Sequence, residues 1–139
     1  MVYDNIDQVS LPQLIAASNW QAQYRLITDW GRLIIPKPEL QQEQYLIQGC
    51  ETPAWLAHEV INDRYRFTFD SHSRVMNGLV AVILSLVDSK TPAELLQLDI
   101  AAILLAAGLA KHLTPSRNNG LQKIIARIYA LAAIEKTLE

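Results

Sequence analysis

The sequence predicts an α+β fold in which a small three-stranded antiparallel sheet packs with helices. Two observations predict it. Apolar residues at helical spacing, with helix start signals, occupy both ends of the chain. The middle carries short segments with the alternation typical of strands, separated by turn residues. The 139 residues, half of them hydrophobic, are enough for one core, so we expect a single domain over residues 1–139.

Helices are expected before the strands. Ser10 and Gln13 have the spacing of a capping box, and Asn19 is a suitable N-cap for a second helix. That second helix must end before Pro36, because proline cannot continue a helix and disfavours helical geometry in the residue before it.

Three strands are expected, at residues 45–48, 54–61 and 64–69. Asn62-Asp63 between the last two is a two-residue hairpin signal. Aromatic and polar residues alternate in the last strand, which predicts a sheet covered by helices on one face. The aromatic residues are Tyr65, Phe67 and Phe69.

Helices are also expected after the sheet. Their predicted starts are Asp70 or Ser71, Thr91, Asp99, and Thr114 or Ser116. The start at Thr91 is the clearest, because a threonine N-cap precedes proline at N1 and glutamate at N3. The last helix carries a stripe of apolar residues that is expected to face the core: Leu121, Ile124, Ile125, Ile128, Leu131 and Ala132.

Charge and composition exclude several classes of function. The formal net charge is −2, and the basic residues are scattered, so no nucleic-acid partner is expected. The longest apolar stretches, 75–87 and 98–109, are too short to cross a membrane. The N-terminus lacks the pattern of a signal peptide, and one cysteine cannot form an internal disulfide. We therefore expect a cytoplasmic protein with a reduced thiol.

Cys50 is the residue with distinctive chemistry. Gly49 before it and Pro53 after it predict a turn between two strands, where a thiol can be presented to another molecule. A lone cysteine is more often a small buried hydrophobic residue than a nucleophile. The histidines, His58, His72 and His112, show no close metal-ligand spacing with it, so no metal site is expected. A Cys-His hydrolase stays open, because such partners meet in space rather than in sequence.

A second feature is the polar segment 116–121, which contains Arg117 near the start of the last helix. Such segments usually cap helices and contact solvent. Here Arg117 can also contribute to an electropositive environment that lowers the pKa of a thiol or engages a partner.

Several segments, in their order and separation, resemble the SufE/CsdE family. These segments are Asn19-Trp20 with Tyr24, residues 47–50 with Trp55, and residues 69–71, 77–82, 90–95 and 112–121. The resemblance covers most of the chain from Asn19 onward. It implies an α+β fold similar to the IscU scaffold.

The resemblance also implies a function. Family members take sulfane sulfur from a pyridoxal-phosphate cysteine desulfurase of the SufS or CsdA type, stimulate it, and pass the sulfur toward iron–sulfur cluster assembly or another acceptor. They are accessory proteins rather than enzymes and need no cofactor of their own. By this match Cys50 is the persulfide acceptor. Residues expected to support the site or contact the partner are Arg117, Gly120, Gly78, Asp70 and His72, the last standing where relatives often carry an acidic residue.

The chemistry of a single thiol fits this function. Sulfane transfer needs one thiolate and no second cysteine, whereas ligation of an iron–sulfur cluster normally uses several. Trp55, Leu56 and the aromatic face of the last predicted strand are expected to line an apolar pocket that protects a persulfide from water. The alternatives are a cysteine hydrolase and a binding module whose cysteine is incidental.

Overall fold

A computed structural model describes residues 1–138, in which helices pack against a two-stranded antiparallel hairpin. The α-helices are α1 (Leu11–Ala16), α2 (Trp20–Gly31), α3 (Arg74–Val87), α4 (Pro92–Leu96), α5 (Ile100–Ala106) and α6 (Pro115–Leu138). The strands are β1 (Ala54–Ile61) and β2 (Arg64–Ser71), and the short 3-10 helices are η1 (Pro38–Leu40), η2 (Glu43–Tyr45) and η3 (Leu109–His112). The predicted α+β class is confirmed.

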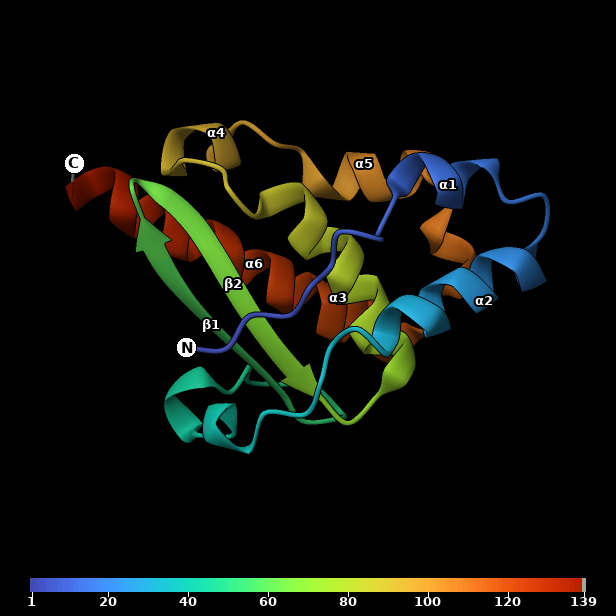
Figure 1. The fold of residues 1–139 in the computed structure, drawn as a ribbon, viewed down its shortest axis with the longest axis horizontal. Coiled ribbons are helices and arrows are strands. Elements are labelled where there is room, and N and C mark those ends of the chain that lie inside the picture. The colour runs from blue at the N-terminus through green and yellow to red at the C-terminus, as the bar shows by residue number, and fades with distance from the viewer. Residues whose placement is uncertain (139) are drawn as a thin grey trace.

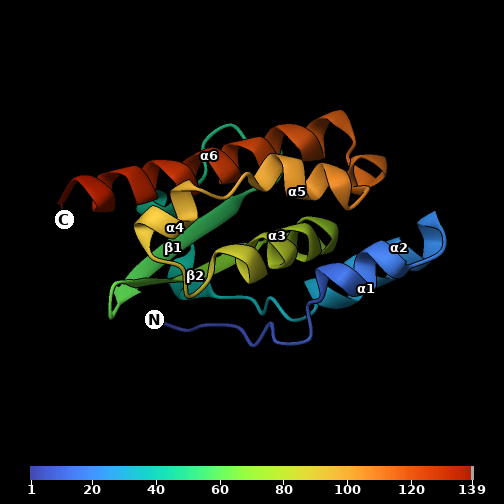
Figure 2. The same cartoon turned by 90° about the horizontal axis from the view of Figure 1, so that it is seen from above.

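Helix α3 occupies the middle of the molecule, as Figures 1 and 2 show. In Figure 2, α6 runs along one side of α3, and α1 and α2 lie on the other side. Strand β2 packs against α3, and the Tyr65 hydroxyl donates a hydrogen bond to the Leu131 carbonyl of α6 (3.1 Å). Most residues of α3 are buried, which fits its hydrophobic character on all sides. Within residues 1–138, no helix is both long and apolar enough to cross a membrane.

Most of the predicted helix starts are confirmed by side-chain caps. The Asn19 side chain accepts a hydrogen bond from the Ala22 amide, and Asp99 accepts one from the Ala102 amide. Thr91 and Glu94 form the complete capping box at the start of α4. In α6 the expected apolar stripe faces the core, with Leu131 only partly buried.

The predicted third strand, at residues 45–48, is wrong. Tyr45 ends the 3-10 helix η2, and only Leu46 makes an isolated bridge, to Trp55 of β1. The chain then turns at Gly49, whose φ is +85°. Because a helical turn precedes this segment and a tight turn follows it, too few extended residues remain to pair as a strand. The sheet therefore has two strands rather than three.

The predicted cap of the central helix is also misplaced. Strand β2 continues through Ser71, and the side chain of Ser73 caps α3 by accepting from the Met76 amide. Asp70 cannot act as the cap, because its carboxylate accepts hydrogen bonds from the Lys37 amide (2.9 Å) and the Gln41 side chain (3.0 Å).

The hairpin is covered on both faces near the start of β1, not on one face as expected. The register pairs Trp55 with Asp70 and Leu56 with Phe69. Because neighbouring side chains of a strand point to opposite faces, these two pairs lie on opposite faces of the hairpin. The Leu56 face joins the main core with the aromatic residues of β2. The Trp55 face forms a second, smaller cluster with Leu40, Ala57, Tyr45 and Leu46.

Helices α2 and α3 approach each other closely at Gly78. A Cβ built on Gly78 would lie 1.9 Å from the Ile27 carbonyl oxygen, so only glycine allows this backbone contact. Gly78 therefore sets the position of α3 rather than lining a pocket.

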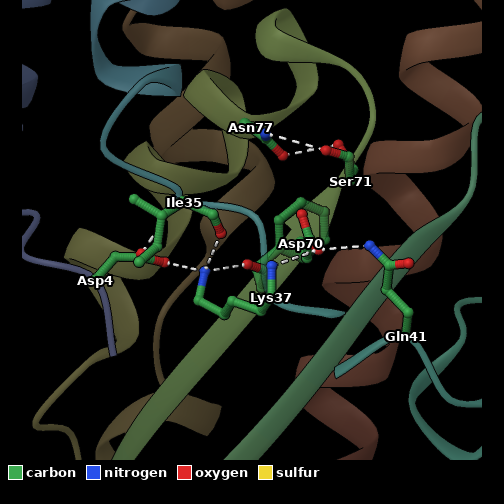
Figure 3. A network of polar contacts seen from close by, with 8 residues as sticks. Asp4, Ile35, Lys37, Gln41, Asp70, Ser71 and Asn77 are labelled. Carbon is green, nitrogen blue, oxygen red and sulfur yellow. Dashed lines mark hydrogen bonds and ion pairs between the residues drawn. The ribbon is translucent and has the colours of Figure 1, made fainter. Parts of the chain in front are cut away.

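A buried ion pair fastens the N-terminal segment to the hairpin, as Figure 3 shows. The Lys37 Nζ lies 2.5 Å from a carboxylate oxygen of Asp4, and the two side chains are only 2% and 3% exposed. Lys37 also donates to the carbonyls of Ile35 (2.9 Å) and Phe69 (2.8 Å). The Asp4 carboxylate accepts from the Ile35 amide as well (3.1 Å). Each charge is thus compensated by a charge and by hydrogen bonds, as a buried pair requires.

Lys37→Met is expected to lower the free energy of unfolding by about 3–5 kcal/mol, because it leaves the Asp4 carboxylate buried without its partner. Adding Asp4→Asn to that variant should restore part of the loss, since a buried amide costs less than an unpaired charge. Chemical denaturation measures both. Arg64→Met is the matched control: its pair with Glu94 is about half exposed (53% and 51%), so its loss should be much smaller than that of Lys37→Met. Equal losses for Lys37→Met and Arg64→Met would contradict this account.

Asp88 joins the end of α3 to the hairpin. Its carboxylate accepts a hydrogen bond from the Phe67 amide (2.9 Å), and Arg66 lies 3.9 Å away. Burial raises the pKa of Asp88 to about 6 despite the opposing effects of these two groups. Asp88 also lines a hollow of about 590 Å³ between the N-terminal segment and β2.

The raised pKa of Asp88 predicts a pH-dependent stability. Between pH 4 and 6, roughly, the folded protein keeps a proton on Asp88 that the unfolded chain has lost, so stability falls as the pH rises through this window. Asp88→Asn keeps an acceptor for Phe67 and removes the titration. Above pH 6 it should be more stable than the wild type by up to about 3 kcal/mol. Urea denaturation from pH 4.5 to 8 tests this, with the exposed hairpin residue changed by Asp63→Asn as control. A wild-type profile in Asp88→Asn would refute it.

Candidate functional site

Cys50 lies in a tight turn that leads into β1. The turn is closed by a hydrogen bond from the Ile47 amide to the Ala54 carbonyl (2.8 Å). Gly49 adopts a φ of +85°, a conformation that side chains disfavour, so glycine lets the chain reverse directly before the cysteine. Cys50 lies in a turn as predicted, but the turn follows an isolated bridge at Leu46 and leads into β1, so it does not join two strands.

The thiol faces a small pocket of about 260 Å³, here called the Cys50 pocket. Its apolar wall comes from Ala54, Met76 and Gly120, and the thiol itself packs against the edge of the main core. The rest of the lining is polar and comes from the cysteine loop, the start of α3 and the start of α6: Glu51, Thr52, Ser73, Thr114, Ser116 and Arg117. Cys50 is therefore partly buried but reachable through the polar rim.

The N-terminal half of α6 holds the cysteine turn on both sides of the thiol. The Asn119 side chain donates to the Gly49 carbonyl (3.0 Å), and the Ser116 hydroxyl donates to the Glu51 carboxylate. Between them, Cys50 Sγ lies 4.0 Å from the Gly120 carbonyl oxygen, within reach of a weak S–H hydrogen bond. A Cβ built on Gly120 would come within 3.5 Å of this sulfur and 3.3 Å of Met76 Cε, so glycine keeps the pocket open.

The pKa of the Cys50 thiol is raised above its ordinary value because burial disfavours the thiolate. The positive charge of Lys123 opposes this and lowers the pKa, but by less. The free protein therefore holds Cys50 mainly as a thiol at neutral pH, and the nucleophilic thiolate is a minor form.

Arg117 reaches the pocket rim but is anchored elsewhere. One guanidinium nitrogen donates to the His112 carbonyl (3.3 Å), and the charge of Arg117 helps to lower the pKa of His112, for which burial is the main cause. The positive charge that lowers the pKa of the thiol is that of Lys123, where the sequence suggested Arg117.

The segment that anchors Arg117 is itself fixed by α2. Gln23 donates its amide to the Leu14 carbonyl (3.2 Å), so its oxygen faces His112 Nε2 at 3.1 Å and must accept from it. His112 therefore carries a proton on Nε2, and its Nδ1 has no hydrogen-bond partner among the described residues. Trp20 stacks on Tyr24, lies 5.3 Å from the His112 ring and donates to the Lys111 carbonyl (3.2 Å). These contacts fix the segment to which Arg117 is anchored at the rim of the Cys50 pocket.

The structure brings together only some of the residues predicted for the site. Cys50, Arg117 and Gly120 line the pocket. Gly78 lies at the α2–α3 contact, and Asp70 is bound to Lys37 and Gln41 on the far face of the hairpin. His72 is exposed, with its ring 5.4 Å from that of Trp55.

The expectation that Trp55, Leu56 and the aromatic face of β2 line the pocket is wrong, and the aromatic residues of β2 lie in the main core. Trp55 belongs to the smaller cluster, and Leu56 points into the main core. Alternation along β1 sends these side chains to opposite faces, and only Ala54, at the start of the strand, reaches the pocket.

Sequence reasoning missed Asn119 and Lys123 as contacts of the cysteine turn. The signal was available as spacing: the two residues are four apart, with Gly120 between them, so on a helix they share a face with Gly120 beside it. A cysteine hydrolase needs a histidine beside its nucleophile. None of the described residues that line the pocket is a histidine.

The fold and this site define a class of α+β protein that presents one partly buried thiol from a turn against a long C-terminal helix. Residues 10–132 match the profile of the family described as "SufE: Fe-S metabolism associated domain". The chain belongs to the SufE family, and the resemblance seen in the sequence is confirmed. This membership gives the protein a role in Fe–S metabolism.

The fold is also similar to a solved one. A hypothetical protein from Thermus thermophilus, determined in solution, aligns with a TM-score of 0.75 and 16% sequence identity. The alignment covers 98% of this chain and 99% of that chain. At this identity the likeness supports the fold alone.

Asn119→Ala is expected to loosen the cysteine turn and expose the thiol. Alkylation of Cys50 by iodoacetamide at pH 7.5 should become about two- to fivefold faster, since lost burial lowers the pKa of the thiol and opens access to it. Asn118→Ala, an exposed neighbour on the same helix, is the control and should react like the wild type. An unchanged rate in Asn119→Ala would mean that this hydrogen bond does not hold the turn.

Proposed function

We propose that this protein is a sulfur acceptor that takes sulfane sulfur from a pyridoxal-phosphate cysteine desulfurase as a persulfide on Cys50 and passes it on toward iron–sulfur cluster assembly. The observation that carries the proposal is the partly buried Cys50 in a small pocket, in a member of a family associated with Fe–S metabolism. The protein acts as an accessory that stimulates the desulfurase, and it requires no cofactor of its own.

The transfer is a thiol exchange that needs no oxidant. The Cys50 thiolate attacks the terminal sulfur of the desulfurase persulfide, and a new S–S bond forms as the old one breaks. The desulfurase cysteine leaves as a thiolate, and the terminal sulfur, with any proton it carries, is now on Cys50. The same exchange, with Cys50 as the leaving group, delivers the sulfur to a thiol of the next acceptor.

The pocket suits this reaction because it has room next to the thiol. Gly120 leaves the space into which an added sulfur can extend, and Met76 supplies an apolar contact that shields it from water. Arg117 and the hydroxyls at the rim are positioned to meet a partner. We assign His72, exposed near the start of α3, to partner contact, and Gly78 and Asp70 to support of the fold beneath the site.

The location proposed is the cytoplasm, since a carrier with one thiol needs a reducing compartment. The alternatives fit less well. A hydrolase needs a histidine near the nucleophile, and none lines the pocket among the described residues. A binding module with an incidental cysteine gives no reason for the room that Gly120 leaves beside the sulfur.

The test is an intact-mass measurement after incubation with a cysteine desulfurase, pyridoxal phosphate and L-cysteine. The protein should gain the mass of one sulfur atom, lose it on reduction, and gain nothing as Cys50→Ser. Desulfurase turnover, followed as alanine release, should rise with the wild type and not with Cys50→Ser. An unchanged mass combined with ester hydrolysis that Cys50→Ser abolishes would favour the hydrolase instead. If the protein neither gains mass nor hydrolyses esters, the binding module is the remaining alternative.

A further inference from the structure

Lys123 lies directly over the turn that carries Cys50. A Cβ built on Gly49 would be 2.6 Å from Cε, 3.0 Å from Nζ and 3.1 Å from Cδ of Lys123. The lysine side chain thus fills the space that any other residue at position 49 would need. Gly49 serves two purposes: its positive φ makes the turn, and its missing side chain admits the lysine.

The position of Lys123 follows from the geometry of α6. Asn119 and Lys123 are one helical turn apart, and Gly120 lies beside them. Asn119 binds the Gly49 carbonyl, Gly120 contacts the sulfur, and Lys123 covers Gly49. Three neighbouring residues of one rigid helix therefore contact two consecutive residues of the loop.

Glu51 and Arg117, the charged groups that line the Cys50 pocket, are bound to other partners. Glu51, next in the chain, is bound to Ser116, and Arg117 is bound to the His112 carbonyl. From the α3 side the pocket is lined by Ser73 and Met76, which carry no charge. Lys123 is exposed, and its positive charge favours the thiolate of Cys50.

We propose that Lys123 is a positioning residue of the sulfur-transfer site, which places its ammonium group over the Gly49–Cys50 turn as the counter-charge of the Cys50 thiolate and of the persulfide that follows it. The inference rests on the proposed function. It gives α6 an electrostatic role in addition to its role in holding the loop.

Gly120 and Lys123 favour different protonation states of the sulfur. The Gly120 carbonyl, as an acceptor, can bind only the protonated thiol. The positive charge of Lys123, placed over Gly49, favours the deprotonated sulfur. The resting thiol is thus held by Gly120, and Lys123 supplies the compensation when the proton leaves. A persulfide anion carries the same charge one atom further out, so the same group serves acceptance and delivery.

The inference is tested by the pH profile of Cys50 alkylation in Lys123→Met, Lys123→Arg and the wild type. Because the chain has one cysteine, iodoacetamide reports on Cys50 alone. Two controls separate charge from packing. Gln122→Met changes the adjacent exposed residue without changing charge, and Lys90→Met removes one positive charge at the end of the hairpin away from Cys50, where the Lys90 carbonyl binds Tyr65.

In Lys123→Met the midpoint of the profile should move to higher pH, and alkylation at pH 7.5 should slow by about threefold or more. Lys123→Arg should restore most of the rate, and 1 M NaCl should reduce the difference between Lys123→Met and the wild type, since salt screens an exposed charge. Both controls should react like the wild type, and thermal melts of all variants should coincide.

A wild-type profile in Lys123→Met would overturn the inference, and so would an equal shift in Lys123→Met and Lys90→Met. Failure of Lys123→Arg to restore the rate would also overturn it, because the charge would then not be the cause. Alkylation involves no desulfurase, so the result is distinguishable from a failure of the proposed function, which would appear as a wild-type protein that gains no sulfur. Where sulfur is gained, Lys123→Met should gain it more slowly.

Discussion

The Cys50 pocket depends on the contact between the Gly49–Cys50 turn and the first half of α6. A turn between a 3-10 helix and a strand has few hydrogen bonds of its own, and a partly buried thiol contributes little to stability. Helix α6 supplies the contacts that the turn lacks. The Asn119 side-chain amide donates to the Gly49 carbonyl, Gly120 packs against the sulfur, and Lys123 lies over Gly49. Because a helix is rigid, these groups keep fixed spacings, and the pocket has a defined shape without any ligand.

The support of that contact extends back through the fold. Helix α6 starts after His112, whose ring is held by Gln23 of α2 and whose carbonyl binds Arg117. Helix α2 in turn is held against α3 at Gly78, where two backbones nearly touch. Gly78 is thus part of the packing that positions α2 and α3, whereas Asp70 fixes the Lys37 amide on the far face of the hairpin.

The parts of the fold that could be predicted from the sequence are those specified by local signals. Capping residues marked the starts of α2, α4 and α5, and Asn62-Asp63 marked the hairpin, where both residues have positive φ. The prediction of a third strand was wrong because Tyr45 belongs to η2 and the chain turns at Gly49. The residues of segment 45–48 that remain are too few to pair as a strand. The cap at Asp70 failed because a distant segment, through Lys37 and Gln41, occupied its carboxylate. Local patterns do not reveal such long-range competition.

The same distinction applies to the site. The turn around Cys50 followed from Gly49 and Pro53, and the polar segment 116–121 was singled out for the positive charge of Arg117 near a helix start. Which charge stands beside the thiol was not predictable, because Arg117 and Lys123 are both basic residues of α6 and only the packing of the helix decides between them.

The partial burial of Cys50 has a consequence for damage by oxidants. Peroxide reacts with the thiolate, which burial keeps scarce in the free protein. A sulfenic acid formed at this position would meet no second cysteine in the chain with which to form a protective disulfide. Shelter of the sulfur is therefore the defence of Cys50 against irreversible oxidation. For the sulfur transfer proposed above, a thiol that becomes reactive only on contact with its donor would keep this protection between encounters.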